Sequence, residues 1–388
     1  MHELHAILDA WTRDPADDAL LATVVHVTGS AYRRPGARMF VPSSRQRVGT
    51  ISGGCLEADV VRRGFWATAG SRPVVRVYDT TGDEDAAWEF GLGCRGVIQI
   101  LLERTRMASC AAQLDFLQRQ RAAGLASVIA TVIRTEPDAP VSVGDRLMVD
   151  AQGASSGALA ATVLAGEVYR HAQLAAQRHE SAIVHLPGVD LFVEWVAPPV
   201  SLVILGAGDD AQPLAAMGRT LGWSVVVADS RPGFARPERF PGADVRAIVA
   251  GASVLPIPVD HRSHVVMMTH NYPLDRQLLP RVMAAGPAYL GLLGPLSRSE
   301  RLFRDCGLTM TECVHAPVGL DLGGDTPATI AAAILGEIQA CVSGRTGGKL
   351  RDRTVGIHAP VAVRGASTFP GAPAGVSPDI CGVTDGVA

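Results

Sequence analysis

Two glycines, a cysteine and a glutamate lie close together in the segment Gly49–Glu57. Gly53 and Gly54 directly precede Cys55, which stands where a helix is expected to begin, and Glu57 falls in the same first turn. Successive amides in a glycine turn can bind an anion, and a helix N-terminus lowers the pKa of a thiol. Because thiolates are soft ligands for sulfur-loving metals, Cys55 is a candidate metal ligand. The alternative is an ordinary buried, apolar cysteine.

A second cysteine lies in a similar setting. Cys94 stands in a glycine-rich segment and is followed by Arg95. Cys94 is therefore a second candidate metal ligand, and Arg95 is a candidate donor to an anion. Arg33 and Arg34 lie in a further segment with turn glycines. Guanidinium groups bind phosphate or carboxylate through a planar fork, and a solvated hairpin loop is the alternative for these two arginines.

A third glycine-rich turn belongs to another class of site. An expected strand over 201–205 leads into Gly206 and Gly208, and Ala211 takes the third position of a G-x-G-x-x-G/A pattern. Asp229 ends the next expected strand, roughly 20 residues further on. This context predicts a Rossmann fold, in which the glycines allow a tight turn and the close approach of a phosphate. Asp229 is then placed to accept a ribose hydroxyl.

The ligand of this turn stays open at the level of sequence. Asp209 and Asp210 stand at the expected helix N-terminus, where two carboxylates oppose a pyrophosphate. Alternatively, the two acids cap the helix. A nucleotide or the phosphate of a pterin are both compatible with the pattern. His270 follows another expected strand, so we expect it to line the crevice at the carboxyl ends of the strands.

The elements around these segments fall into three zones. Residues 1–195 favour an N-terminal α+β domain, divisible near 110, with strands over 21–28, 37–41, 74–78 and 126–134 and helices over 2–12, 55–68, 111–123 and near 157–172. Residues 200–343 favour a Rossmann-like, doubly wound parallel sheet domain. Its strands are expected over 201–205, 224–228, 264–268 and 288–292, and its helices over 210–221, near 275–285, 297–306 and 327–341. Residues 344–388 resemble a flexible tail, and no internal repeat is evident.

Composition excludes several classes of protein. With 35 basic and 38 acidic residues and a net charge of -3, nucleic-acid binding through bulk charge is not expected. Neither a signal peptide nor a membrane-spanning helix is expected from the sequence. Seven cysteines without a C-x-x-C pair are a poor disulfide framework, which indicates a reducing cytoplasm. No residue set resembles a nucleophile–base–orienter triad.

Taken together, these segments resemble the XdhC/CoxI family of accessory proteins for molybdenum hydroxylases. The resemblance runs in the family's order from about residue 10 to residue 345. It is carried by 29–39, 49–57, 91–96, 206–211, 269–275, 289–295 and 315–323. Gly53, Gly54, Cys55 and Glu57 match the family's first-domain motif. Cys94 matches the second cysteine motif, in which Arg95 replaces a glycine that is more usual in the family.

The resemblance implies a protein that binds molybdenum cofactor, a pterin dithiolene that carries molybdenum and a phosphate. Such a protein protects the cofactor, supports its sulfuration by a cysteine desulfurase and inserts it into an apo molybdenum hydroxylase of the xanthine-dehydrogenase type. The resemblance also implies a homodimer, and the cargo is either plain molybdopterin or a dinucleotide form. The alternatives are an NAD(P)-dependent oxidoreductase built on the Rossmann half and a scaffold that has lost its ligand.

Overall fold

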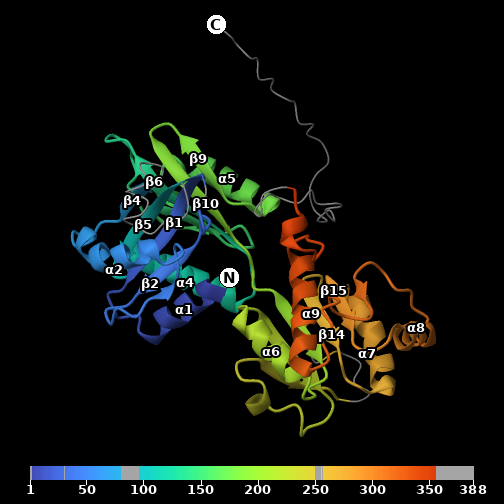
Figure 1. The fold of residues 1–388 in the computed structure, drawn as a ribbon. Helices are drawn as coiled ribbons and strands as arrows, with labels where there is room; N and C mark the ends of the chain where they lie inside the picture. Colours follow the sequence, from blue (N-terminus) through green and yellow to red (C-terminus); the bar gives the residue numbers. More distant parts are fainter. Residues whose placement is uncertain (1, 30, 80–95, 250–254, 256, 355–388) are drawn as a thin grey trace, which may run out of the picture.

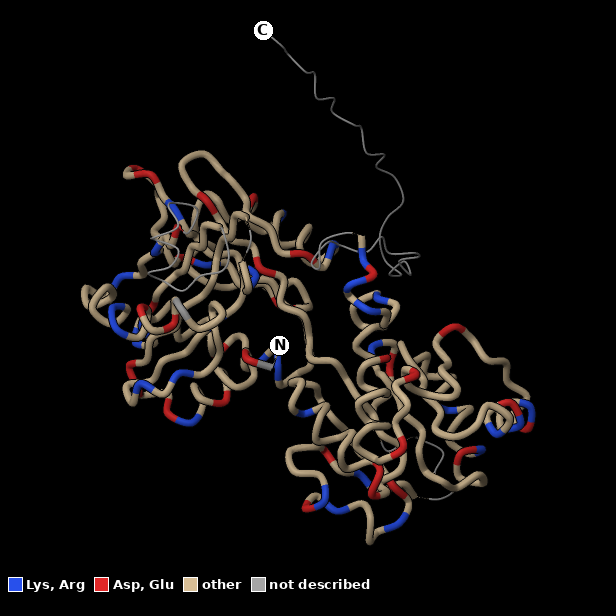
Figure 2. Tube along the Cα trace, viewed as in Figure 1, with Lys and Arg blue, Asp and Glu red and all other residues tan. Residues whose placement is uncertain are grey.

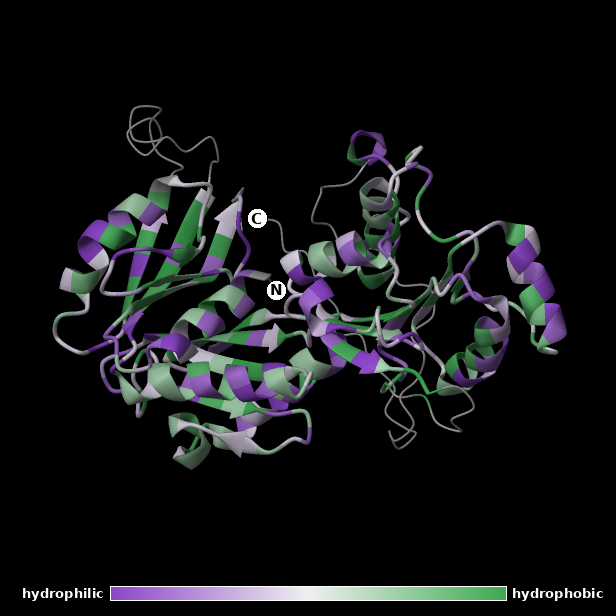
Figure 3. Ribbon diagram, turned by 90° about the horizontal axis from the view of Figure 1, so that it is seen from below, coloured by the Kyte–Doolittle hydropathy of each residue, from purple (hydrophilic) through white to green (hydrophobic). Residues whose placement is uncertain are grey.

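The computed structural model describes residues 2–29, 31–79, 96–249, 255 and 257–354, and in Figure 1 these form two lobes. The first lobe contains two antiparallel sheets, and the second contains one parallel sheet. The strands of both lobes are mainly hydrophobic, whereas the helices that cover them have mixed faces (Figure 3). Most of the tail expected at 344–388 lies outside the described residues.

The first sheet has five strands in the order β3-β2-β1-β5-β4. Val, Leu and Ile dominate its central strands, so that β1 is buried from Leu20 to Val25. The elements of this part of the chain are α1 His2–Arg13, β1 Leu20–Gly29, β2 Arg38–Val41, β3 Val48–Gly49, α2 Cys55–Ala67, β4 Val74–Asp79, β5 Gly96–Arg104 and α4 Ala108–Ala122.

The second sheet has five strands in the order β8-β7-β6-β10-β9. A helix was expected near 157–172, but the chain forms a short 3-10 helix, Ala158–Ala161, and then α5, Ala165–Arg178. Thr162 lies between them with an extended backbone, which suits its β-branched side chain and separates the two helices. The strands are β6 Ser127–Thr135, β7 Arg146–Val149, β8 Ser155–Ser156, β9 Ala182–Leu186 and β10 Val189–Val196.

These two sheets are copies of one unit, so the expectation of no internal repeat is wrong at the level of structure. Their strands are arranged in the same order. The pairs Thr23↔Arg38 and Thr131↔Arg146 lie at equivalent places, separated by the same number of residues. The amide of Gly36 donates to Val24 O at 2.8 Å, and at the same sequence spacing the amide of Gly144 donates to Val132 O at 2.9 Å. The repeat escapes sequence inspection because the shared residues, such as Gly36/Gly144 and Arg38/Arg146, are scattered.

Buried ion pairs join the two repeats and are exchanged between them. Arg38 of the first repeat pairs with Glu194 of the second, with Nη1 and Oε1 2.7 Å apart. Arg146 of the second repeat pairs with Glu103 of the first, where the two side chains are 3% and 0% exposed. A cluster of four buried side chains, Val25, Leu101, Ile133 and Phe192, draws on both sheets in the same symmetric way.

The second lobe has one sheet of six parallel strands in the order β13-β12-β11-β14-β15-β16. The chain builds outward on one side from β11 and then crosses to β14, so the strand order reverses between these two strands. Helices α6 and α9 pack on one face and α7 and α8 on the other. The strands are β11 Ser201–Leu205, β12 Ser224–Asp229, β13 Asp244–Ala247, β14 Ser263–Met267, β15 Tyr289–Leu292 and β16 Val314–His315. The helices are α6 Ala211–Thr220, α7 Tyr272–Ala285, α8 Leu296–Asp305 and α9 Pro327–Val342.

This architecture confirms the predicted fold class, an α+β region followed by a Rossmann-like parallel sheet. Basic and acidic residues are interspersed over both lobes (Figure 2). Among the helices of the described residues, none is long and apolar enough to cross a membrane.

Candidate functional site

The Gly206 turn stands at the point where the strand order of the parallel sheet reverses. Gly206 has a φ of +114°, and a Cβ at this position would lie 2.3 Å from Met268 O. The turn after β11 therefore touches the backbone that follows β14, which only a glycine permits. A Cβ on Gly208 would meet Asp210 Oδ1 at 2.4 Å, and Ala211 is fully buried at the start of α6.

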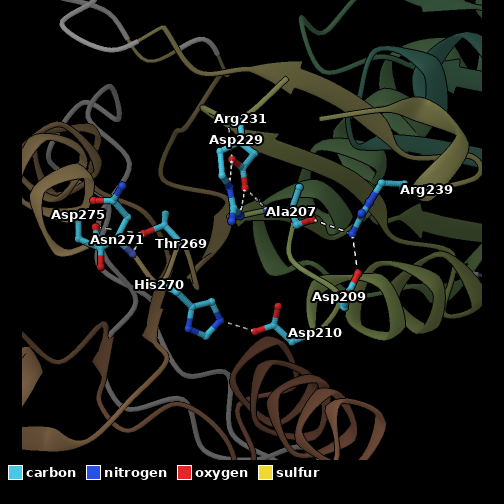
Figure 4. Close-up of polar contacts among 10 residues, drawn as sticks. All are labelled: Ala207, Asp209, Asp210, Asp229, Arg231, Arg239, Thr269, His270, Asn271 and Asp275. Carbon is cyan, nitrogen blue, oxygen red and sulfur yellow. Dashed lines mark hydrogen bonds and ion pairs between the residues drawn. The ribbon is translucent and has the colours of Figure 1, made fainter. Parts of the chain in front are cut away.

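The two acids of this turn are paired with basic side chains (Figure 4). Asp210 Oδ2 lies 2.7 Å from Nε2 of His270, and Asp209 Oδ1 accepts from Arg239 Nη2 at 2.8 Å. Asp210 occupies the N-cap position of α6, but its side chain caps no backbone amide. The capping alternative is therefore wrong for Asp210, whose carboxylate instead links the turn to the loop after β14.

Asp229 is 3% exposed at the end of β12, and its own chain occupies both of its oxygens (Figure 4). Oδ2 accepts the Ala207 amide at 2.7 Å and Arg231 Nη2 at 2.7 Å, while Oδ1 accepts the Arg231 amide at 2.8 Å. Burial opposes ionisation, but the Arg231 guanidinium and the two amides outweigh it and lower the pKa of Asp229. A role for Asp229 toward a ribose hydroxyl stays a prediction.

A cavity of about 330 Å³ lies beside these groups, between the loops that follow β12 and β14. It is lined by Asp229, Arg231, Thr269 and His270, among other residues. Behind the cavity, buried Asp275 accepts from Thr269 Oγ1 at 2.5 Å and from Arg298 Nη2 at 2.6 Å. His270 has a left-handed backbone and a side chain that is 62% exposed. The cavity is thus lined by an imidazole and a guanidinium, which pair with Asp210 and Asp229 respectively.

In the first lobe, Glu57 organises the turn that carries Gly53, Gly54 and Cys55. Its carboxylate is 1% exposed and accepts the amides of Ser52 at 2.8 Å and Gly54 at 3.1 Å. Burial opposes ionisation of Glu57, but the Ser52 hydroxyl and these amides lower its pKa. Glu57 is therefore the anion that this turn already holds, and it shapes the backbone around Cys55.

Replacing Glu57 by glutamine is expected to destabilise the chain at neutral pH, because a neutral amide accepts these hydrogen bonds less well. The lowered pKa means that the carboxylate stabilises the fold fully above the ordinary value, about 4.3, and loses this effect as the pH falls through its folded value. The difference in the free energy of unfolding between wild type and Glu57→Gln, measured with urea, should therefore become smaller below about pH 4. A difference in unfolding free energy that stays constant with pH would contradict this role of the carboxylate.

The arginine segment lies against the same turn. Glu3 of α1 pairs with Arg33 and also accepts from Thr50 Oγ1 at 2.8 Å, so one carboxylate ties the two segments together. Tyr32 borders Gly53, since a Cβ on that glycine would lie 4.0 Å from the tyrosine Cγ. Arg33 Nε is buried without a hydrogen-bond partner among the described residues. The structure thus brings Arg33 and the glycine turn together.

A cavity of about 430 Å³ opens beside this arginine segment, and Tyr32, Arg33 and Arg34 are among the residues that line it. Arg34 is exposed. Cys55 is the first residue of α2, after Gly54 with its φ of +127°. Cys94 and Arg95 lie outside the described residues, directly before Gly96 at the start of β5. The N-terminal group and the Gly206 group lie in different lobes (Figure 1).

Sequence reasoning missed the partners that hold these residues. Arg231, Arg239 and Glu3 carried no motif, and only the fold brings them to their partners. It also missed a Cys–His–Glu set, in which Cys341 Sγ lies 3.9 Å from His315 Nε2 and His315 Nδ1 lies 3.2 Å from Glu337 Oε1. Burial and the charge of Glu337 raise the pKa of Cys341, so this thiol stays protonated and is a weak nucleophile.

Two family models match the chain. The model of the XdhC and CoxI family matches residues 13–79 and 120–187, which cover β1–β4 of the first repeat and β6–β9 of the second. The model of the XdhC Rossmann domain matches residues 202–338. The parallel sheet identified above therefore corresponds to the Rossmann domain of that family.

Individual proteins agree with these matches. A protein of Bacillus subtilis described as a probable xanthine dehydrogenase subunit is 30% identical, over 87% of this chain and 97% of that protein. The molybdenum cofactor insertion chaperone PaoD of Escherichia coli is 23% identical, over 82% of each chain. A crystal structure of a xanthine dehydrogenase from Bacillus halodurans superposes with a TM-score of 0.73 at 24% identity, covering 91% of this chain and 98% of that one. The chain therefore belongs to the XdhC/CoxI family.

Proposed function

We propose that this chain is a chaperone that binds molybdenum cofactor and inserts it into an apo molybdenum hydroxylase. The observation that carries the proposal is the cavity lined by Arg33 and Arg34, which the Glu3 carboxylate ties to the turn that precedes Cys55. The name of the relative PaoD, a molybdenum cofactor insertion chaperone, supports the same function.

The residues present fit the chemistry of this cofactor. When bound, molybdenum cofactor supplies an anionic phosphate, a planar pterin and a molybdenum atom with a preference for sulfur ligands. The exposed Arg34 and the orphaned Nε of Arg33 offer donors to a phosphate. Cys55, the first residue of α2, is the candidate sulfur ligand for the metal. A protein that delivers a cofactor needs charged groups that bind it and ligands that exchange, since the cofactor must dissociate again.

The proposal has finer parts. The chain holds the cofactor while a cysteine desulfurase sulfurates it, acts as a homodimer, and works in the cytoplasm. Residues 1–195 and 200–343 serve as its two domains, with Cys94 and Arg95 as further contacts to the cofactor. The Rossmann half, through Gly206, Gly208 and Ala211, takes the nucleotide of a dinucleotide cofactor or a separate nucleotide.

The test is molybdenum and pterin analysis of the protein purified from a host that makes the cofactor. We expect close to one molybdenum and one pterin per chain. Cys55→Ala should lose most of the molybdenum while its circular dichroism and thermal unfolding match wild type. Cys313→Ala, a free cysteine of the other lobe, is the matched control and should retain the metal.

Two results would count against this function. An unchanged molybdenum content in Cys55→Ala would show that this residue is not a ligand of the metal. Absence of both pterin and molybdenum, even with a client hydroxylase co-expressed, would favour the NAD(P)-dependent oxidoreductase. In that case NADH or NADPH should raise the melting temperature, since a ligand at 100 times its Kd adds about 2.7 kcal/mol of stability.

A further inference from the structure

The second repeat contains a further cavity, which shares only Trp195 with the lining of the cavity beside the arginine segment. Its volume is about 700 Å³, within the range of small-molecule sites. The first strand of the repeat, β6, and β7 form one side, α5 forms another, and the loop at His261 and Arg262 of the Rossmann lobe closes the mouth. The cavity therefore lies between the two lobes, where ligand sites are common.

The first repeat shows what fills the same space there. Phe65 of α2 lies between two guanidinium groups, with Arg45 at 4.8 Å and Arg104 at 4.5 Å from its ring centroid. Strand register identifies the corresponding positions in the second repeat, because Arg104 pairs with Leu20 and Trp195 pairs with Val128 at the equivalent places.

Turn geometry identifies the other equivalent position. Phe40 pairs with Val48 across the β2–β3 hairpin, and Met148 pairs with Ser156 across the β7–β8 hairpin, which makes Gly153 the counterpart of Arg45. Both residues have a left-handed backbone, with φ of 64° and 84°. Gly153 and Trp195 both line the cavity. In the second repeat Tyr169 of α5 takes up part of this space, since its hydroxyl donates to Gly153 O at 2.9 Å, and the remainder is the cavity.

The side chains of α5 explain why the space is open. This helix lines the cavity with Tyr169, Ala172, Gln173 and Ala176, and its two alanines are too small to fill it. Trp195 forms part of the lining with its ring fixed by stacking on His179, at 4.8 Å between centroids. The rings of Trp195, His179 and Tyr169 in the lining favour a planar ligand.

One polar group in the lining lacks a partner. Ser127 is 3% exposed, and its hydroxyl makes no hydrogen bond among the described residues. A buried hydroxyl without a partner costs stability, and a ligand atom can satisfy it. The charge at the mouth is already balanced, since Arg262 pairs with Asp260 and donates to Gly124 O at 2.8 Å. The lining of the cavity thus favours an uncharged ring with one hydrogen-bonding group.

We propose that the second repeat binds an uncharged, planar heteroaromatic molecule of two or three fused rings in this cavity. The ring lies beside Trp195 and Tyr169 and hydrogen-bonds to Ser127. The Arg262 loop covers the mouth, so the ligand contacts both lobes. This site is separate from Cys55 and from the Gly206 turn, and it does not depend on the proposed cofactor function.

The experiment titrates the full chain into riboflavin and, separately, into pterin, both of which lose fluorescence on stacking with tryptophan. We expect saturable quenching with one site per chain for at least one of these probes. Ala176→Leu, at an exposed helix position that lines the cavity, should abolish it by filling the space. Gln177→Leu, the next residue and outside the lining, should bind like wild type. Ser127→Ala should weaken binding about fivefold, the effect of one hydrogen bond.

Folding of each variant is checked by circular dichroism, and Gln173→Leu provides a second filling variant should Ala176→Leu unfold. Failure of both probes to bind wild type would overturn the proposal. Equal binding by wild type and a folded filling variant would overturn it as well, because the ring would then sit elsewhere. Saturable binding of decanol without either aromatic probe would show a general apolar cavity and contradict the assigned ligand class.

Discussion

Glu194→Ala is expected to lower the free energy of unfolding by about 3–5 kcal/mol, because it leaves a buried guanidinium without its counter-ion. Arg38 is 4% exposed, and its two terminal nitrogens are bound to Glu194. Chemical denaturation followed by tryptophan fluorescence measures this loss. The exposed pair Arg246–Asp244 provides the control, and Asp244→Ala should change stability little.

The double variant Arg38→Met with Glu194→Leu separates charge from packing. It removes both charges and keeps similar volume, so it should recover most of the stability lost in Glu194→Ala. A loss as large as in the single variant would mean that the hydrogen bonds of the pair, and not the unpaired charge, account for the effect.

Gly206→Ala is expected to destabilise the Rossmann lobe by about 3 kcal/mol or more. The added methyl group would lie 2.3 Å from Met268 O and 2.8 Å from Thr269 Cα, both of which are backbone atoms. In addition, a φ of +114° is unfavourable for any residue with a Cβ. Thermal unfolding monitored by circular dichroism should show the loss.

Gly233→Ala is the matched control, since a Cβ there meets nothing within 4 Å. It should unfold close to the wild-type temperature. Equal melting temperatures for the Gly206 and Gly233 variants would contradict the close approach between the turn and the loop after β14.

The fold was largely predictable where a periodic pattern and a turn signal coincide. Strand β11, the Gly206 turn and helix α6 were placed within a residue or so of their bounds, since glycine chemistry and a buried Val/Leu run mark them together. The repeat was not predictable, because it rests on register and backbone hydrogen bonds. Gly36 and Gly144 show this, since the Gly-x-Arg triplet in which each stands is too short a match to reveal the repeat.

The candidate site was predictable only as a set of positions. Glycines, Cys55 and the arginines stand out by type and spacing, but their partners come from distant parts of the chain. Glu3 binds Arg33 and Thr50, and Arg239 binds Asp209. No local sequence pattern predicts these contacts. Side-chain roles that depend on such partners follow from tertiary structure alone.

The exchanged ion pairs also bear on the order in which the chain folds. During synthesis, the first repeat emerges with Arg38 and Glu103, but Arg146 and Glu194 follow only with the second repeat. Until residue 194 has emerged, Arg38 and Glu103 lack the partners that they have in the complete fold. We therefore expect the two repeats to complete their shared interior together. Cutting the chain near residue 110 would leave two fragments, neither with a satisfied interior.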